Sequence, residues 1–467
     1  MSGNFVQRGA PALLPKHLRA EMALKSGADL VIELPVFYAC ASAEYFAYGA
    51  VSLLHALHCV DSICFGSECG DLTLLQKAAN IMAEEPDAYK HSLQSYLRDG
   101  YRFPLARQKA FQDFTKEERI ASILEQPNNI LGIEYLKALS SLNSPIQPFA
   151  ISRIGSGYHE TDLHKIYSSA SAIRKTVSTT KELESLSGHV PDSALTLLKE
   201  NYQVRFPVFL NDFSLLLKYR LLNESADTLT QYLDVSVELA HRIIRCRNQF
   251  QSFEQFCHLL NTKESTYARV SRALMHILLQ IQKDDFSLCT AKAPFYLRIL
   301  GFRKESVAVL SEIKKCANVP LLTKLTAKIP FLLGQKLLNA DLFAADLYES
   351  VITENSIHHF KTNMSSRLYA SSTSAAHIYV SISLLLLHTL PPMLPIRCGT
   401  PHSAITDPCR LYNSENAPPI LLSSFLLPRH CMCKRQARPS FYCQNDAADL
   451  FPSHPTSSFS PASNLSL

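Results

Sequence analysis

The stretch Val60-Asp-Ser-Ile-Cys-Phe-Gly66 decides the fold class that this sequence predicts. It is a short apolar run that ends in a glycine, which is typical of a buried strand closed by a turn. Helical apolar spacing precedes it over residues 42–57 and follows it over 72–84, and two more strand-like runs occupy residues 28–35 and 148–153. Strands separated by helices of this length predict βαβ units and a parallel sheet, which is an α/β fold.

The ends of the predicted strands are candidate ligand positions. In parallel sheets, ligands bind beyond the carboxyl ends of the strands, where Gly66 and Arg153 lie in this sequence. A glycine at this place lets a ring or a phosphate approach the backbone closely, although a plain strand-to-helix turn also explains it. Gly66 and Gly70 form neither a G-x-G-x-x-G nor a Walker pattern.

The segment Ser168-Ser-Ala-Ser-Ala-Ile-Arg-Lys175 is the most informative motif. Its serines lie before an expected helix. The free amides of that helix start, the hydroxyls of Ser169 and Ser171 and the guanidinium of Arg174 together make an anion site. A nucleotide triphosphate suits such a site, with Arg153 as a second cation on the same ligand. A serine-capped surface helix with solvated basic residues is the alternative interpretation.

Two asparagines form a third candidate. Asn128 and Asn129 follow Pro127 and precede a helix predicted over residues 131–139. One of them can cap that helix, and the other can present its amide to a base or a ribose. Capping alone accounts for at least one of the two.

The chain from about residue 190 to 350 predicts a helical domain, because apolar residues recur there at helical spacing. The run 295–301 is interpreted as one of these helices, ending at a C-cap glycine. Two helices carry arginines three residues apart, and each pair projects to one side: Arg242 with Arg245, and Arg269 with Arg272. Such pairs can follow a nucleic-acid phosphate backbone, although a solvated charged face is commoner.

The last segment, residues 352–467, has a different composition. From residue 351 onward it holds one glycine, twelve prolines and five acidic residues, without apolar periodicity. This composition predicts a disordered tail, and the sequence of this segment looks like the translation of a shifted reading frame.

Charge and cysteine usage limit the class of protein further. The chain has 46 basic and 41 acidic side chains, so its net charge of +5 permits a nucleic-acid partner without demanding one. Its cysteines are mostly scattered singly, and the sequence shows neither a signal-peptide stretch nor an apolar run long enough for a membrane span. We expect a cytoplasmic protein without a membrane association, and we predict no metal site and no protein partner.

These motifs resemble the bacterial tRNA(Met) cytidine acetate ligase family, which is nucleotidyltransferase-like. The resemblance spans about residues 1–350 and implies an ATP-binding domain with a Rossmann-like (HUP-type) parallel sheet in residues 1–180 and a helical tRNA-binding domain in 190–350. The segments that carry it are residues 1–9, 27–35, 42–49, 61–68, 127–132, 169–175, 267–276 and 319–324.

The resemblance implies a reaction in two steps. Acetate and ATP, the latter expected with Mg²⁺, give acetyl-adenylate and pyrophosphate, and the acetyl group then passes to the wobble cytidine of elongator tRNA(Met). The family's ATP contacts correspond to Gly66, Asn128, Arg153 and Ile154. The motif with Ser169, Ser171 and Arg174 resembles its phosphate-binding signature, and Arg242, Arg245, Arg269 and Arg272 are implied tRNA contacts. The resemblance assigns no catalytic side chain, because acetate itself attacks the α-phosphate.

The resemblance also implies a difference at the amino end. The family begins with a strand and a His-x-Gly-His-type motif that contacts the triphosphate, whereas this sequence contains no His-x-Gly-His and starts just past it. We expect the first strand and helix of the sheet to be missing and ATP binding to suffer. An RNA-binding remnant without catalysis is therefore one alternative to the ligase. An adenylyltransferase with a small-molecule acceptor is another, which the long helical part with its paired arginines disfavours.

Overall fold

The structure is a computed structural model, and it describes residues 1–153, 168–179, 182–262, 265–290, 294–324, 332–355 and 369–371. Its strands are β1 (Phe5–Val6), β2 (Ala10–Pro11), β3 (Leu30–Glu33), β4 (Ser62–Ser67), β5 (Gln147–Ser152), β6 (Leu297–Arg303), β7 (Leu321–Leu322) and β8 (Tyr369–Ser371).

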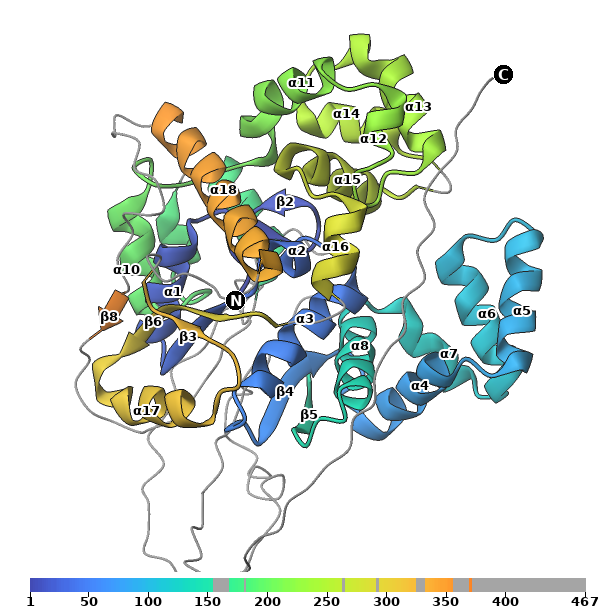
Figure 1. Ribbon diagram of the computed structural model, residues 1–467, viewed down its shortest axis with the longest axis horizontal. Coiled ribbons are helices and arrows are strands. Elements are labelled where there is room, and N and C mark those ends of the chain that lie inside the picture. The colour runs from blue at the N-terminus through green and yellow to red at the C-terminus, as the bar shows by residue number, and fades with distance from the viewer. Residues whose placement is uncertain are drawn as a thin grey trace, which may run out of the picture. The chain divides into compact units, whose positions relative to one another are not determined.

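The helices of the amino-terminal part are α1 (Lys16–Lys25), α2 (Val36–Ala39), α3 (Ala43–Ala56), α4 (Leu72–Glu84), α5 (Asp87–Arg98), α6 (Phe103–Thr115), α7 (Glu118–Ser122), α8 (Pro127–Ser141) and α9 (Ala170–Thr179). Those that follow are α10 (Asp192–Asn201), α11 (Ser214–Leu222), α12 (Ala226–Leu229), α13 (Val237–Cys246), α14 (Phe253–Leu260), α15 (Tyr267–Leu279), α16 (Lys283–Thr290), α17 (Val307–Cys316) and α18 (Leu332–Asn355). Figure 1 labels these elements along the chain.

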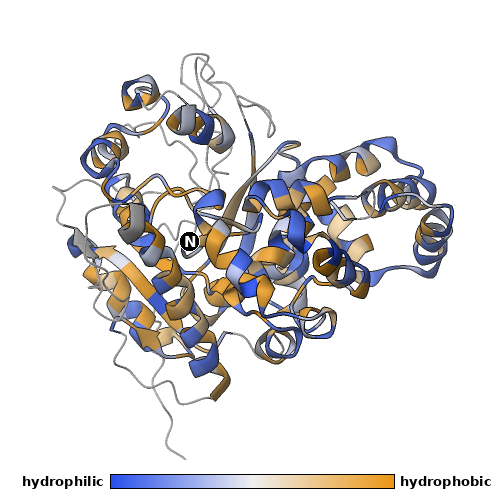
Figure 2. Ribbon diagram, turned by 90° about the horizontal axis from the view of Figure 1, so that it is seen from above, coloured by the Kyte–Doolittle hydropathy of each residue, from blue (hydrophilic) through white to orange (hydrophobic). Residues whose placement is uncertain are grey.

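The predicted parallel pairing is confirmed for β4 and β5. They run parallel, with Phe65 opposite Ala150 and Gly66 opposite Ile151. Helix α8 packs against β4, α3 and α4, so the crossover between the two strands covers them as in a βαβ unit. The side chains of Ile63 and Phe65 are buried beneath these helices. Figure 2 shows largely hydrophobic ribbon along strands and the helices beside them.

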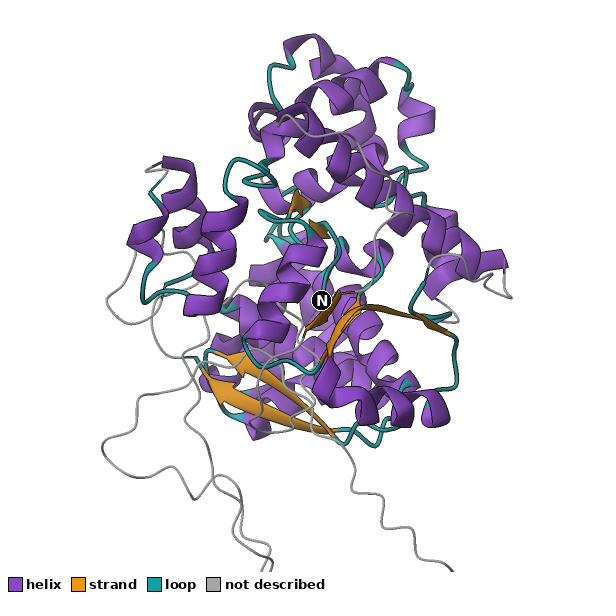
Figure 3. Cartoon of the chain, turned by 90° about the vertical axis from the view of Figure 1, so that its left-hand side faces the viewer, coloured by secondary structure: helices purple, strands orange, loops and turns teal. Residues whose placement is uncertain are grey.

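Strand β3 belongs to a different sheet, and this differs from the expectation of one parallel sheet. It pairs antiparallel with β6, and β6 pairs parallel with β7 and β8. Figure 3 shows the strands in separate groups among the helices. The interpretation of residues 295–301 as a helix is therefore wrong. Periodicity alone cannot distinguish a short apolar run in a buried strand from one in a buried helix.

The first residues of the chain lie against β3 and are buried. The backbone N–H of Leu34 donates to the carbonyl of Met1 at 2.8 Å, and Ser2 bridges to Leu34 in parallel. Strands β1 and β2 then form a hairpin whose turn reaches α15. Gly9 has φ +70°, and a Cβ there would lie 2.4 Å from the backbone nitrogen of Arg272, so only glycine fits.

The carboxyl-terminal part is more ordered at its start than the composition predicts. Helix α18 continues to Asn355, and β8 pairs residues 369–371 with β6, so these parts of the predicted tail form regular secondary structure. The buried side chains of α18 explain the helix, because Leu337, Leu338 and Tyr348 join the main hydrophobic core. The rest of the predicted tail, residues 372–467, lies outside the described residues.

Candidate functional site

The carboxyl ends of β4 and β5 bring three predicted residues to one place. Gly66 is the fifth residue of β4 and faces Ile151 of β5. Arg153 directly follows β5, and its backbone N–H donates to the carbonyl of Ser67 at 2.9 Å. Asn128 lies at the start of α8 and is joined to the segment after β4 by hydrogen bonds. This is the position where parallel α/β sheets bind ligands.

Glu68 lies in the segment after β4 and connects that segment to the start of α8. Its carboxylate accepts hydrogen bonds from the Nδ2 atom of Asn128 at 2.6 Å and from the backbone N–H of Asn129 at 2.8 Å. The carboxylate thus satisfies amides at the amino end of α8 and is favoured by the helix dipole. The Oδ1 atom of Asn129 accepts from the backbone N–H of Cys69 at 3.1 Å. Neither asparagine side chain caps its own helix, which is a role the sequence assigned to at least one of them.

A second group surrounds Arg174 on α9. Burial lowers the pKa of Arg174, Tyr348 raises it and the positive charge of Arg8 lowers it further. Arg19 also lies within electrostatic range of Arg174, and burial lowers the pKa of Arg19 to about 10. Arg19 and Arg174 both lie within electrostatic range of the phenol of Tyr348, and Arg8 lies within range of Arg174. The Tyr348 hydroxyl donates a hydrogen bond to the carbonyl of Ala12 at 2.7 Å. Such a concentration of positive charge favours a polyanionic ligand.

The serines of this segment have separate roles. The hydroxyl of Ser169 accepts a hydrogen bond from the backbone N–H of Ala172 at 3.0 Å, which is the helix-capping role named as the alternative. Ser168 contacts His189 at 3.0 Å, and Ser171 is half-buried in the first turn of α9. Of the predicted phosphate ligands, Ser169 thus caps the helix, and Arg174 lies in the basic group described above.

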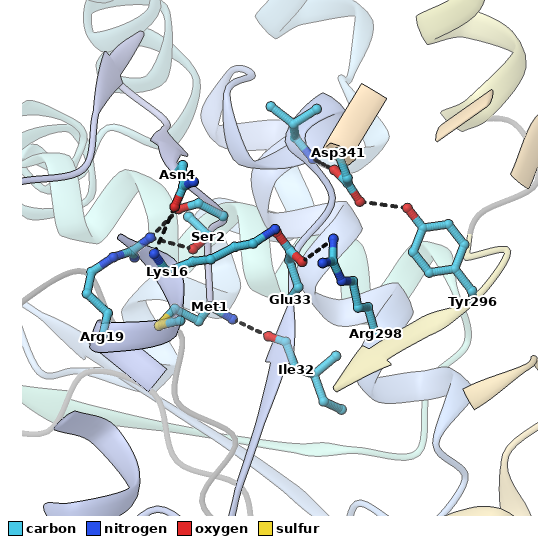
Figure 4. Close-up of polar contacts among 12 residues, drawn as sticks. Met1, Ser2, Asn4, Lys16, Arg19, Ile32, Glu33, Tyr296, Arg298 and Asp341 are labelled. Carbon is cyan, nitrogen blue, oxygen red and sulfur yellow. Dashed lines mark hydrogen bonds and ion pairs between the residues drawn. The ribbon is translucent and has the colours of Figure 1, made fainter. Parts of the chain in front are cut away.

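Arg19 also fixes the backbone of the first residues. Its Nη2 atom donates to the carbonyls of Ser2, at 3.1 Å, and of Gly3, and its Nε atom donates to Leu14. The Oδ1 atom of Asn4 accepts from the backbone N–H of Lys16 at 2.8 Å. Figure 4 shows Arg19 beside Ser2, and Asn4 beside Lys16. These bonds hold residues 2–4, which precede the hairpin that contains Arg8, against α1.

Sequence reasoning missed a buried ionic cluster next to this segment. Glu33 forms ion pairs with Lys16 at 2.7 Å and with Arg298 at 3.1 Å, and all three side chains are at most 4% exposed. Asp341 of α18 accepts from the hydroxyl of Tyr296 at 2.7 Å and from the backbone N–H of Val36 at 2.6 Å. Figure 4 shows the cluster joining α1, β3, β6 and α18.

Two of the four predicted tRNA contacts are engaged within the chain. Arg242 donates from Nη1 to the carbonyl of Leu260 at 3.0 Å, and Arg272 pairs with Asp234 at 3.1 Å. Arg245 and Arg269 are exposed, in keeping with a nucleic-acid contact and with a solvated face alike.

The remaining predictions concern Ile154, metal ligands and membrane-spanning helices. Ile154, the fourth implied ATP contact, lies outside the described residues. Within the described ranges, no three His, Cys, Asp or Glu side chains gather as metal ligands would. None of the described helices is long and apolar enough to cross a membrane.

Comparisons with known proteins identify the family of this chain. The profile of the family described as HIGH Nucleotidyl Transferase matches residues 1–363. The chain is 43% identical over 358 residues to the tRNA(Met) cytidine acetate ligase of Thermoanaerobacter sp. (strain X514), covering 76% of this chain and 88% of that relative. It is 40% identical over 357 residues to the protein of the same name from Clostridium perfringens (strain ATCC 13124), covering 74% and 86%.

Solved structures extend the likeness to the fold. TmcAL of Thermotoga maritima in its apo form superposes with a TM-score of 0.75 at 30% sequence identity, over 80% of this chain and 92% of that one. The same protein bound with alpha-thio ATP gives a TM-score of 0.73 at 31% identity, over 80% and 91%. The fold is that of a nucleotidyl transferase. The chain belongs to the tRNA(Met) cytidine acetate ligase family and is an enzyme of the ligase class.

Proposed function

We propose that this chain activates acetate with ATP and transfers the acetyl group to the wobble cytidine of elongator tRNA(Met). In the first step a carboxylate oxygen of acetate bonds to the α-phosphorus, and the bond from that phosphorus to the β-bridging oxygen breaks and releases pyrophosphate. In the second step the exocyclic amine of the cytidine attacks the acetyl carbonyl, AMP leaves, and the amine loses a proton. The relatives' names and the nucleotide-bound neighbour support this assignment.

The observation that carries the proposal is the meeting of Gly66, Asn128 and Arg153 at the carboxyl ends of β4 and β5. Gly66 lets the nucleotide approach the backbone, and Arg153 supplies a charge. The Glu68 carboxylate holds the Asn128 amide in one orientation. The Oδ1 atom of Asn128 has no hydrogen-bond partner within the described part of the chain, so it can accept one from a base or a ribose.

The positive groups of the second cluster suit the triphosphate. Arg174, with Arg8 and Arg19 in electrostatic range, would hold the phosphates and stabilise the charge that develops on the leaving pyrophosphate. Mg²⁺ would enter with ATP, since it is commonly bound by phosphate oxygens and only one or two carboxylates. Catalysis then depends on positioning the reactants and on stabilising the charge of the leaving pyrophosphate, and a side-chain nucleophile is unnecessary.

The helical part would receive the tRNA. Arg245 on α13 and Arg269 on α15 are exposed and would contact phosphates, whereas Arg242 and Arg272 would support the helices that present them. We place this reaction in the cytoplasm, where the substrate tRNA and ATP are available.

Acetate-dependent exchange of radiolabelled pyrophosphate into ATP tests the first step without RNA. We expect exchange that requires acetate, and the transfer of labelled acetate to elongator tRNA(Met) but not to a transcript whose wobble cytidine is replaced by uridine. Exchange with acetate and no transfer to tRNA would favour a small-molecule acceptor. Tight tRNA binding without any exchange would favour an RNA-binding protein that lacks ligase activity.

A further inference from the structure

The turn between α5 and α6 exposes an unusual group of side chains. Every residue from 97 to 105 is exposed, and this segment, here called the 97–105 tip, carries four large apolar side chains. Their exposed fractions are 40% for Leu97, 39% for Tyr101, 54% for Phe103 and 44% for Leu105. A compact group of exposed rings and aliphatic side chains marks an interaction surface rather than scattered surface residues.

The backbone of the tip is held in one conformation. Helix α5 ends at Arg98, and Gly100 follows with φ +81°. The N–H of Gly100 donates to Leu97 at 3.1 Å, and the N–H of Tyr101 donates to Tyr96 at 3.1 Å. This is the Schellman arrangement, whose usual apolar contact is supplied by the rings of Tyr96 and Tyr101, with centroids 5.6 Å apart. Since α5 and α6 also pack side by side as a hairpin (Figure 1), the rings are presented on a rigid support.

Positive charge surrounds these rings. The Nζ atom of Lys109 lies 5.2 Å from the ring centroid of Tyr101, and the Cζ atom of Arg107 lies 5.6 Å from that of Phe103. Arg98 and Arg102 are exposed on either side of Tyr101, and Asp99 is the one acidic residue of the tip. Exposed rings flanked by guanidinium groups are the chemistry that stacks on unpaired bases while contacting their phosphates.

We propose that the 97–105 tip is a contact surface for the unpaired loop of an RNA hairpin. Bases stack on Tyr101 and Phe103, and Arg98 and Arg102 contact the phosphates beside them. This inference rests on the proposed function for the source of the RNA, the substrate tRNA. It adds a surface apart from the arginine pairs of the helical part. The excess of positive charge favours RNA over a second copy of this chain, because two such tips would repel each other.

The test uses the full chain and two labelled RNA probes, the anticodon stem-loop of elongator tRNA(Met) and a duplex of equal length without a loop. The double variant Tyr101→Ala/Phe103→Ala should lose about tenfold or more in affinity for the stem-loop and keep its affinity for the duplex. Phe103→Trp, which keeps a ring, should retain stem-loop binding. Phe114→Ala is the matched control, because Phe114 is on the same helix α6 and is 37% exposed.

A second variant tests the charges. Arg98→Ala/Arg102→Ala should lower the slope of log affinity against log salt by about 1 per phosphate contact removed. Circular dichroism spectra and melting temperatures establish that each variant is folded.

Several results would overturn the proposal. They are unchanged stem-loop affinity in the folded double alanine variant, an equal loss for Phe114→Ala, or no RNA binding by the unmodified chain. A change in sedimentation of the double variant with RNA affinity unchanged would assign the tip to self-association instead. Pyrophosphate exchange needs no RNA, so the tip variants should retain it. If the unmodified chain shows no pyrophosphate exchange but binds RNA through the tip, the proposed function is contradicted and the RNA contact at the tip is still supported.

Discussion

Glu33 of β3 and Arg298 of β6 face each other as register partners across an antiparallel pair, with the Oε2 and Nη1 atoms 3.1 Å apart. A second charge pair stands at the other end of the same two strands, where Asp29 accepts from the Nε atom of Arg303 at 2.9 Å. The two pairs bracket an apolar centre of Leu30, Val31 and Ile32. Opposite charges at both ends select this register, because a slip by one residue would bury each charge against an apolar neighbour.

We expect Glu33→Gln to destabilise the fold strongly. Burial alone would raise the pKa of Glu33, but Arg298 and Lys16 outweigh it and lower the pKa to about 2. Removing the negative charge leaves Lys16 and Arg298 without their buried ion-pair partner, which costs about 3 kcal/mol or more. Urea denaturation measures the change. The control is Glu21→Gln, which breaks the partly exposed pair with Lys25 and should cost less than about 1 kcal/mol. Equal losses would show that the buried cluster is not electrostatically coupled.

Asp341 should make the folded state more stable as the pH falls, whereas an acid in an ion pair usually has the opposite effect. Burial and the nearby charge of Glu33 raise the pKa of Asp341 to about 6, above its unfolded value of 3.8. The folded state therefore holds this proton more tightly, and protonation adds stability as pH falls from 7 to 4. The free energy of unfolding should rise over this window by on the order of 2 kcal/mol relative to Asp341→Asn. Parallel pH profiles of the two proteins would contradict the assignment.

The sequence predicted the local elements better than their long-range partners. Helix α4 has the predicted bounds of 72–84, because its amphipathic spacing is complete within one segment. Strand β6 was not predicted as a strand, because what makes it one is its pairing with β3, far away in the chain. The register charges Glu33 and Arg298 carry no local signal in the sequence that would identify them as partners.

The same holds for the candidate site: features within one segment were predicted, and contacts between distant segments were not. Asn128 was predicted because a polar pair between a proline and an apolar helix is visible locally. The role of Glu68 in holding it was not predicted, because that contact joins two loops that only the sheet brings together. Asp341 is a single acid in the long helix α18, and its burial follows from the packing of that helix, which composition does not reveal.

Glu68 should be more important for stability than Asn128. Its carboxylate accepts from Asn128 and from the backbone N–H of Asn129 at the start of α8. Glu68→Ala removes these bonds and should cost about 1–2 kcal/mol of folding free energy, measured by urea denaturation. Asn128→Ala should change stability by less than half as much and weaken ATP binding in calorimetric titration. Unaltered ATP affinity in Asn128→Ala would remove that residue from the nucleotide site.

Arg174→Ala should weaken ATP binding by roughly tenfold to a hundredfold, because a charge-assisted contact to the triphosphate is lost. Isothermal titration calorimetry with ATP measures the affinity. Lys175→Ala is the matched control, since Lys175 is the next residue of the same helix, carries the same charge and is exposed. An equal loss in both variants would indicate a long-range effect of charge, and no loss in Arg174→Ala would show that the cluster with Arg8 and Arg19 does not hold the phosphates.

The four arginines of the helical part should separate into two classes. Arg245→Ala/Arg269→Ala should leave the melting temperature unchanged and lower the salt slope of tRNA binding by about 1 per contact removed, because both side chains are exposed. Arg272→Ala should lower the melting temperature, because Asp234 loses its partner at 3.1 Å. Differential scanning fluorimetry and binding titrations at several salt concentrations distinguish the classes. An unchanged salt slope in the exposed double variant would mean that these arginines form only a solvated face.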